Sequence, residues 1–253
     1  MRGEPTLSIR GEQRVGAVQR VRALAKLTLS LRVVGVRADG FHLVESEMVT
    51  LDLADELEFS EGDGLEIVGN GAVLQEVSDG DDNLIRRALR VAGRTAYVRL
   101  YKRIPVGGGL GGGSADAAAV LRWAGVRDLD LAASLGADVP MCLVGGRAFV
   151  TGIGERVQPL PFEERSFTLL TPPFSVSTPA VYRAWDELGG PRADGPNDLE
   201  PAALKVEPRL AAWQDVLGDA SGRTPILAGS GSTWFVPGTF EGPGFVQTRS
   251  DRP

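Results

Sequence analysis

Six glycines stand within seven positions, at 107–109 and 111–113. Of all segments in the sequence, this one has the residue types and spacing that most clearly indicate a ligand-binding site. Glycine lacks a Cβ atom, so its backbone can adopt positive φ and approach a ligand closely. A Ser and an Ala-rich stretch follow, which predicts a helix that begins beside the loop at about residue 115. Backbone N–H groups and the positive end of the helix dipole then converge on one point. Such an arrangement binds phosphate, and we interpret residues 105–115 as a phosphate-binding loop.

Other kinds of glycine loop are alternatives for this segment. The P-loop pattern requires a Lys after its last glycine, and none follows here. The dinucleotide pattern G-x-G-x-x-G does match Gly107, Gly109 and Gly112, but a run of glycines satisfies almost any spacing. In a dinucleotide-binding fold the first glycine also follows its strand directly, whereas Ile104-Pro105-Val106 intervene here. A dinucleotide oxidoreductase and a plain tight turn therefore remain as weaker alternatives.

The composition excludes several classes of protein. Hydrophobic residues make up 43% of the 253 residues and charged residues 24%, which is typical of a folded globular chain. One Cys and one His (Cys142 and His42) are too few for a Cys/His zinc site or an intramolecular disulfide. A net charge of −6 argues against a nucleic-acid partner, which needs a basic face. The absence of a long apolar run or an apolar leader predicts a cytoplasmic protein with no membrane partner.

The hydrophobic pattern predicts strands first and mostly helices later, which indicates an α+β fold rather than a regular βαβ repeat. Asn83 is the expected N-cap of a helix that ends at Gly93. Strands are expected at 27–36, 47–59, 65–68, 96–104, 147–160 (as a hairpin), 166–171 and 225–236 (as two), and helices at 115–124, 129–135, 179–188 and, in part, 202–217. We expect a disordered tail over 1–20, a first subdomain over 21–160 and a second over 161–253, with the ligand between the two subdomains.

Three segments, taken in order with the glycine loop, are similar to motifs of one family. They are Ala25-Lys26-Leu27-Thr28-Leu29 in the first strand, Arg37-Ala38-Asp39-Gly40-Phe41-His42 after it, and Gly136-Ala137-Asp138-Val139-Pro140 after the second helix beyond the loop. Together they resemble the GHMP small-molecule kinases, and segments 197–201 and 228–233 are similar to later motifs of that family. The resemblance covers about residues 22–236. It implies a two-subdomain GHMP kinase fold, whose N-terminal part is similar to the second domain of ribosomal protein S5.

The resemblance also implies an activity and a set of site residues. The motifs are most similar to those of members that transfer the γ-phosphate of ATP to the 2-hydroxyl of a cytidine diphosphate sugar alcohol in isoprenoid biosynthesis. Lys26 and Asp138 would be the catalytic pair, and Phe41 and Tyr182 would enclose the cytosine. ATP, with Mg²⁺ on an unassigned ligand, would bind Pro105, Val106, Gly107, Gly108, Gly109, Leu110, Gly111, Gly112, Gly113, Ser114 and Ala115. The acceptor substrate would contact Thr28, Phe41, His42, Pro179, Tyr182, Gly229, Ser230 and Gly231, in a monomer or weak homodimer.

The proposed residue types suit phosphoryl transfer, which requires positioning and charge neutralisation rather than covalent chemistry. A carboxylate can orient the acceptor hydroxyl and take its proton late in the reaction. A neighbouring ammonium group keeps that carboxylate ionised and offsets charge on the transferring phosphoryl group. Two aromatic rings around a pyrimidine contribute about 1–3 kcal/mol of stacking each.

Each residue has a simpler explanation, and some positions depart from the family pattern. Lys26 could be a surface lysine, Asp138 a loop cap, His42 structural, Tyr182 a core residue beside Trp185, and 229–231 a plain turn. Thr28 stands where the family usually has Asn, and Ala115 where Ser is common. The segment 124–131 is short, and the Gly- and Pro-rich end after Val236 lacks the usual closing helix and final strand. A kinase for mevalonate, homoserine or a sugar, and a weakly active nucleotide-binding homologue, remain alternatives.

Overall fold

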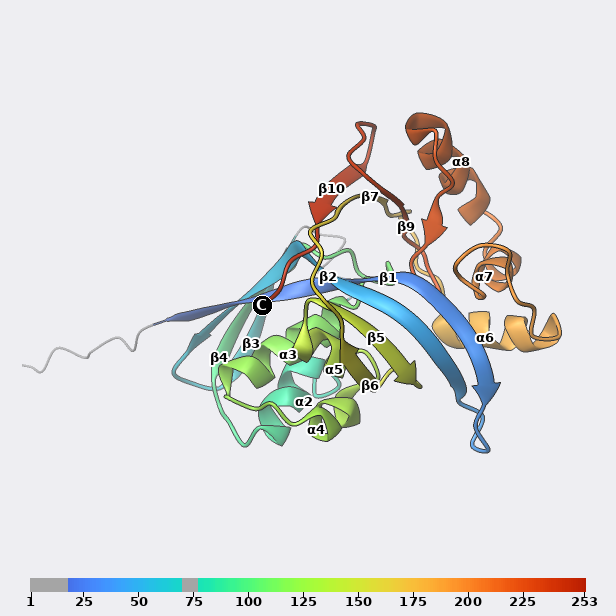
Figure 1. The fold of residues 1–253 in the computed structure, drawn as a ribbon. Helices are drawn as coiled ribbons and strands as arrows, with labels where there is room; N and C mark the ends of the chain where they lie inside the picture. Colours follow the sequence, from blue (N-terminus) through green and yellow to red (C-terminus); the bar gives the residue numbers. More distant parts are fainter. Residues whose placement is uncertain (1–17, 70–76) are drawn as a thin grey trace, which may run out of the picture.

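Two sheets, each covered by helices, make up the computed structural model, which describes residues 18–69 and 77–253 (Figure 1). The strands of the first sheet are β1 (Gln19–Val36), β2 (His42–Ser60), β3 (Gly64–Val68), β4 (Tyr97–Tyr101), β5 (Arg147–Gly152) and β6 (Arg156–Pro159). Their order is β3-β4-β2-β5-β6, with β1 paired to β2 beside this path. The β3–β4 pair is parallel and the other pairs are antiparallel, so the strands-first pattern in the sequence produces a mixed sheet.

Helices cover one face of the first sheet (Figure 1), and the glycine loop leads into one of these helices. They are α2 (Leu84–Val91), α3 (Gly112–Trp123), α4 (Leu129–Leu135) and α5 (Val139–Val144). Asn83 caps α2 as predicted, because its side chain accepts a hydrogen bond of 2.8 Å from the N–H of Ile85. The alanines of α3 are fully buried, and their small side chains let the helix lie close to the strands. α3 begins at Gly112 rather than near 115, since the last two glycines of the loop are already helical.

The second sheet has the order β10-β7-β9-β8 and its own core around Trp234. Its strands are β7 (Ser166–Leu170), β8 (Ile226–Leu227), β9 (Trp234–Pro237) and β10 (Phe245–Arg249), and its helices are α6 (Thr178–Glu187), α7 (Glu200–Val206) and α8 (Leu210–Ser221). The expectation that the chain after Val236 lacks a final strand was wrong. The Gly- and Pro-rich segment 237–244 reverses the chain, and β10 then pairs antiparallel with the edge of β7. No helix follows β10 up to Pro253.

The hairpin formed by β1 and β2 is much longer than the pattern predicts and reaches from one core to the other (Figure 1). Residues 1–17 of the expected tail lie outside the described residues, but Gln19 and Arg20 already pair with Phe59 and Glu58 of β2. At the opposite end, Leu31 belongs to the core of the second sheet. The hairpin therefore carries its residues into the space between the two sheets.

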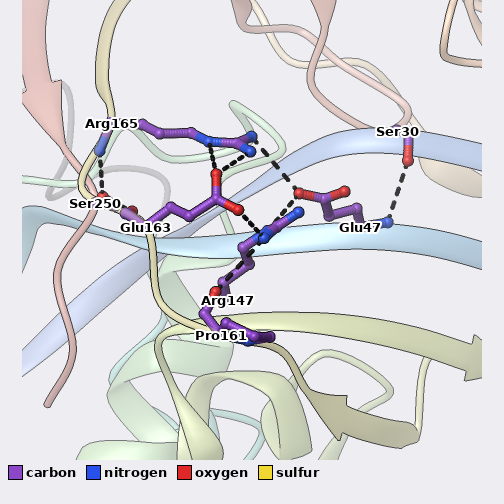
Figure 2. A network of polar contacts seen from close by, with 7 residues as sticks. All are labelled: Ser30, Glu47, Arg147, Pro161, Glu163, Arg165 and Ser250. Carbon is purple, nitrogen blue, oxygen red and sulfur yellow. Dashed lines mark hydrogen bonds and ion pairs between the residues drawn. The ribbon is translucent and has the colours of Figure 1, made fainter.

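A network of charged side chains ties the segment between the sheets to the first sheet, as Figure 2 shows. Arg147 of β5 donates to Glu47 of β2 at 2.7 Å and also pairs with Glu163 in the segment between β6 and β7. Arg165 donates to Glu163 at 2.9 Å through its guanidinium, and its backbone N–H donates to Ser250 at the end of β10. These contacts fix the path of the chain where it passes from one sheet to the other.

Candidate active site

A cavity of about 690 Å³ lies between the two sheets and is lined by both halves of the chain. This volume is typical of a small-molecule site. The sequence-predicted residues that line it are Lys26, Thr28, Pro105, Val106, Gly107, Gly108, Gly109, Leu110, Gly111, Gly112, Gly113, Ser114, Asp138, Tyr182, Gly229 and Ser230. Ala115 and Gly231 do not line it. Ala115 is fully buried in α3, and Gly231 packs against Leu227 behind the turn.

The glycine loop needs glycine because it runs against the opposite wall of the cavity. Gly109 has φ +76°, and a Cβ atom there would lie 2.6 Å from the carbonyl oxygen of Gly231 and 2.7 Å from that of Ala228. Gly108 accepts a hydrogen bond of 3.2 Å from the backbone N–H of Thr233. The loop of the first half and the 228–233 turn of the second half are therefore in direct backbone contact.

The start of α3 is open to an anion. Gly111 is the N-cap residue with φ +69°, and no side chain caps the helix. The first N–H groups of a helix have no partner within it, and the helix dipole makes this end positive. Gly112, Gly113 and Ser114 line the cavity at this point. The first turn of α3 thus has the geometry of a phosphate-binding site.

Beneath the loop lies a buried charge cluster that the sequence reasoning did not assign. Asp55 of β2 accepts hydrogen bonds from the N–H groups of Arg103 and Ile104, at 2.5 and 2.8 Å, and pairs with the ammonium group of Lys102. Lys102 also donates to Asp116 of α3 at 3.0 Å. Burial raises the pKa of Asp116 to about 7, although the charge of Lys102 opposes the shift. The cluster connects the chain that enters the loop to the helix that leaves it.

Only part of this cluster left a signal in the sequence. Lys102 precedes the loop and Asp116 stands in the first turns of α3, so both are close to it in the chain. Asp55 is 47 residues from Lys102, and only the pairing of β2 with β4 brings it there.

Lys26 and Asp138 meet at the floor of the cavity. The Lys26 ammonium nitrogen lies 3.3 Å from Oδ2 of Asp138 and 3.3 Å from Oγ1 of Thr28. Lys26 is only 6% exposed, so it is not a surface lysine. Its backbone N–H donates to the carbonyl of Leu110 at 2.9 Å, which holds β1 against the glycine loop. Asp138 occupies the N-cap position of α5, but its side chain caps nothing, which leaves the carboxylate for the cavity.

An aromatic end adjoins this floor. A second cavity of about 430 Å³ is lined by Phe41, His42, Pro179 and Tyr182, and it shares Tyr182 with the first cavity. Phe41 is 55% exposed, and the guanidinium of Arg37 lies 5.4 Å from its ring centre. Burial, and after it the charge of Asp138, raises the pKa of Tyr182 to about 12. Apart from Gly231, the predicted substrate residues therefore line these two cavities, which adjoin at Tyr182, and Phe41 lines the outer one.

Asn197 is a supporting residue whose role the sequence reasoning missed. Its amide nitrogen donates to the carbonyls of Leu227 and Gly229, at 2.9 and 2.7 Å, and the residue is 1% exposed. These bonds hold the turn whose Gly229 and Ser230 line the cavity, and Ser230 is also hydrogen-bonded to Thr178 at 2.7 Å. The motif at 197–201 was visible in the sequence, but its contact with this turn was not.

Comparisons with known proteins identify the family. A profile of the GHMP kinases N terminal domain matches residues 83–146. The chain is 37% identical over 257 residues to a 4-diphosphocytidyl-2-C-methyl-D-erythritol kinase from Rhodopseudomonas palustris, covering 85% of this chain and 86% of that protein. The chain belongs to the 4-diphosphocytidyl-2-C-methyl-D-erythritol kinase family of GHMP kinases. A member of this kinase family from Pelotomaculum thermopropionicum is 39% identical over 253 residues, covering 84% of this chain and 86% of that protein.

Solved structures agree with this family assignment. A crystal structure of a 4-(cytidine 5'-diphospho)-2C-methyl-D-erythritol kinase superposes with a TM-score of 0.70 at 34% identity, covering 86% of this chain and 89% of that one. A mevalonate kinase from Methanococcus jannaschii has a TM-score of 0.56 at 13% identity, covering 94% and 99%, and shares the fold alone. The predicted family and the α+β GHMP kinase fold are confirmed, and the dinucleotide oxidoreductase alternative was wrong.

Proposed function

We propose that this chain transfers the γ-phosphate of ATP to the 2-hydroxyl of 4-diphosphocytidyl-2-C-methyl-D-erythritol. The observation that carries the proposal is the Lys26–Asp138 pair at 3.3 Å, which lines the same cavity as the glycine loop, next to the adjoining aromatic cavity. A nucleotide triphosphate on the loop and a cytidine diphosphate sugar alcohol across the floor would meet at this pair. The relatives named above carry the same activity in their names.

In the proposed mechanism the chain positions the reactants and offsets their charge. The carboxylate of Asp138 accepts a hydrogen bond from the acceptor hydroxyl and takes its proton as the oxygen bonds to phosphorus. The ammonium group of Lys26 pairs with that carboxylate and attracts the oxygens of the transferring group. The N–H groups of Gly112 and Gly113 hold the remaining phosphates at the start of α3. Thr28 accepts a hydrogen bond from Lys26 and so fixes its side chain.

The proposal includes Mg²⁺, which supplies charge neutralisation on the nucleotide phosphates when it is bound. The described residues contain no cluster of three or more His, Cys, Asp or Glu side chains that could hold a metal alone. Mg²⁺ commonly binds through substrate phosphates, waters and one or two protein oxygens, and this mode fits the donors present. The hydroxyl of Ser114, which lines the cavity at the start of α3, is the protein oxygen that we assign to it.

The aromatic end is the proposed position of the cytosine ring. Phe41 is exposed and is steadied by Arg37, so it offers a free ring face to a base. Tyr182 is half-buried and has His42 against it, with ring centres 4.7 Å apart. Base stacking on aromatic side chains contributes about 1–3 kcal/mol per base. A substrate without a base, such as mevalonate or homoserine, would leave this end of the space empty.

We also propose that the enzyme acts in the cytoplasm, where ATP is available, and as a monomer or weak homodimer. Both walls of the cavity come from one chain, so the site needs no partner subunit. None of the helices within 18–69 and 77–253 has the length and hydropathy that a bilayer span requires.

An assay of ADP release tests the proposed function. Purified full-length protein is given ATP, Mg²⁺ and, in separate reactions, the cytidylylated methylerythritol, mevalonate or homoserine. We expect turnover with the first acceptor only, and loss of that turnover in Asp138→Ala with ATP affinity changed by less than about threefold. Equal turnover with homoserine or mevalonate would contradict the substrate assignment. Full turnover by Asp138→Ala would remove Asp138 from the mechanism.

A further inference from the structure

His42 is held in one orientation by three neighbours. Its Nε2 atom lies 2.8 Å from Oδ1 of Asp186, which stands on α6 one turn after Tyr182. The ring of Tyr182 packs on the imidazole face, and that of Trp185 meets it edge-on with centres 5.6 Å apart. The side chain of His42 is only 10% exposed. These contacts leave the imidazole little freedom to turn.

The contact with Asp186 selects one tautomer of His42. A carboxylate only accepts hydrogen bonds, so the proton of the neutral ring must be on Nε2, and Nδ1 is left with a lone pair. Within the described ranges Nδ1 has no hydrogen-bond partner. Two buried side-chain atoms in these ranges lack a partner, Asp116 Oδ1 and Ser232 Oγ, and Nδ1 of His42 is not one of them. Nδ1 is therefore accessible from outside the core. His42 lines the aromatic cavity, and its Nδ1 is accessible to a hydrogen-bond donor.

We propose that Asp186 is a positioning residue that makes this site select a pyrimidine with an exocyclic amine over one with a carbonyl at the same place. The inference rests on the proposed function, because it takes the aromatic end as the base site. Cytosine carries an amine that can donate to Nδ1 of His42, whereas uracil carries an oxygen there. Two acceptors facing each other lose the hydrogen bond and remain desolvated. Asp186 acts only through His42, by keeping the acceptor on the cavity side.

Because His42 is the only histidine in the chain, its tautomer can be read directly. Full-length protein labelled with ¹⁵N-histidine gives one pair of imidazole nitrogens, recorded at a pH where the spectrum itself shows a neutral ring. We expect a protonated Nε2 in the wild type and a mixture of tautomers in Asp186→Ala. Glu187→Ala is the matched control, since Glu187 is the next residue on α6 and pairs with Lys205, not with His42. A protonated Nδ1 in the wild type, or the same single tautomer in Asp186→Ala, would overturn the proposal.

A binding measurement then tests selectivity, with CDP and UDP as the probes. Sites that hydrogen-bond a ligand group reject analogues lacking it by about tenfold or more. We expect the wild type and Glu187→Ala to bind CDP at least about tenfold more tightly than UDP, and Asp186→Ala to lose most of that ratio. A ratio that stays within twofold of wild type in Asp186→Ala would refute the role of Asp186 alone. A wild type with no preference for CDP would refute both this inference and base recognition at the aromatic end, and the ADP-release assay would show separately whether the proposed reaction occurs.

Discussion

Replacing Gly109 by alanine tests the glycine loop more sharply than removal of a charged side chain. The residue has φ +76°, a left-handed conformation that costs an L-residue with a Cβ about 1–2 kcal/mol. The new Cβ would also lie 2.6 and 2.7 Å from two backbone carbonyl oxygens, closer than such atoms pack. These carbonyls belong to Ala228 and Gly231 in the opposite wall, so the loop must move away from it. The phosphate-binding N–H groups then leave their positions.

The expected size of the effect follows from this strain. A change of 1.4 kcal/mol corresponds to a factor of about ten in affinity, so Gly109→Ala should weaken ATP binding at least about tenfold. Gly218→Ala is the matched control, because Gly218 is a helical residue of α8 outside the cavity, and its Cβ would meet Pro225 at an ordinary contact distance of 3.5 Å. There alanine should raise the free energy of unfolding by about 0.5–1 kcal/mol and Tm by about 1–4 °C, as a Gly to Ala change does in a helix.

Calorimetric titration of ATP and thermal unfolding of both variants separate binding from stability. If Gly109→Ala binds ATP as tightly as Gly218→Ala does, the loop is not the phosphate site and the reasoning fails. If Gly218→Ala also loses ATP affinity tenfold, the loss in Gly109→Ala does not report the contact of Gly109 with the opposite wall.

Two further predictions address the aromatic end and the buried charge cluster. Tyr182→Ala should raise KM for the cytidine substrate about 5–140-fold, from about 1–3 kcal/mol of lost stacking, and leave KM for ATP nearly unchanged. Steady-state kinetics that showed an equal rise in KM for both substrates would contradict this role. Because the pKa of Asp116 is raised to about 7 in the folded state from an ordinary value of 3.8, the native state holds a proton that the unfolded state releases. Its contribution to the free energy of unfolding is complete below about pH 4 and is lost as pH rises through 7. Asp116→Asn should therefore lose less stability than wild type between about pH 5 and 8 in urea unfolding, and an equal loss in both proteins would contradict the assignment.

The parts of the fold that follow from local rules were predictable. The cap at Asn83 places the start of α2. Residues 202–217, expected to be helical in part, cover most of α7 and α8, and Pro208 lies in the break between these two helices. The final strand β10 was not predictable, because its pairing with β7 depends on backbone hydrogen bonds that side-chain pattern does not reveal. The early start of β1 at Gln19 has the same cause, since β2 offers it a partner.

The residues of the candidate site were also predictable only in part. The resemblance in the sequence named Lys26 and Asp138, and the structure brings these two side chains to 3.3 Å from positions 112 residues apart. The supporting contacts of Asp55 and Asn197 could not be predicted from the sequence, because these residues form hydrogen bonds to segments that only the fold brings close to them. Nothing in the sequence distinguishes these two polar residues from others of their type. Their supporting role follows from burial beside backbone groups that need a hydrogen-bond partner.

The seam between Gly108 and Thr233 has a consequence for protein engineering. A chimera that joined residues 18–160 of this kinase to the remainder of a relative would have to inherit a matching surface on both sides of that seam. Gly109 and Gly231 would thus have to come from the same parent, although 122 positions separate them. Nucleotide affinity in such hybrids would report the fit of the two parents.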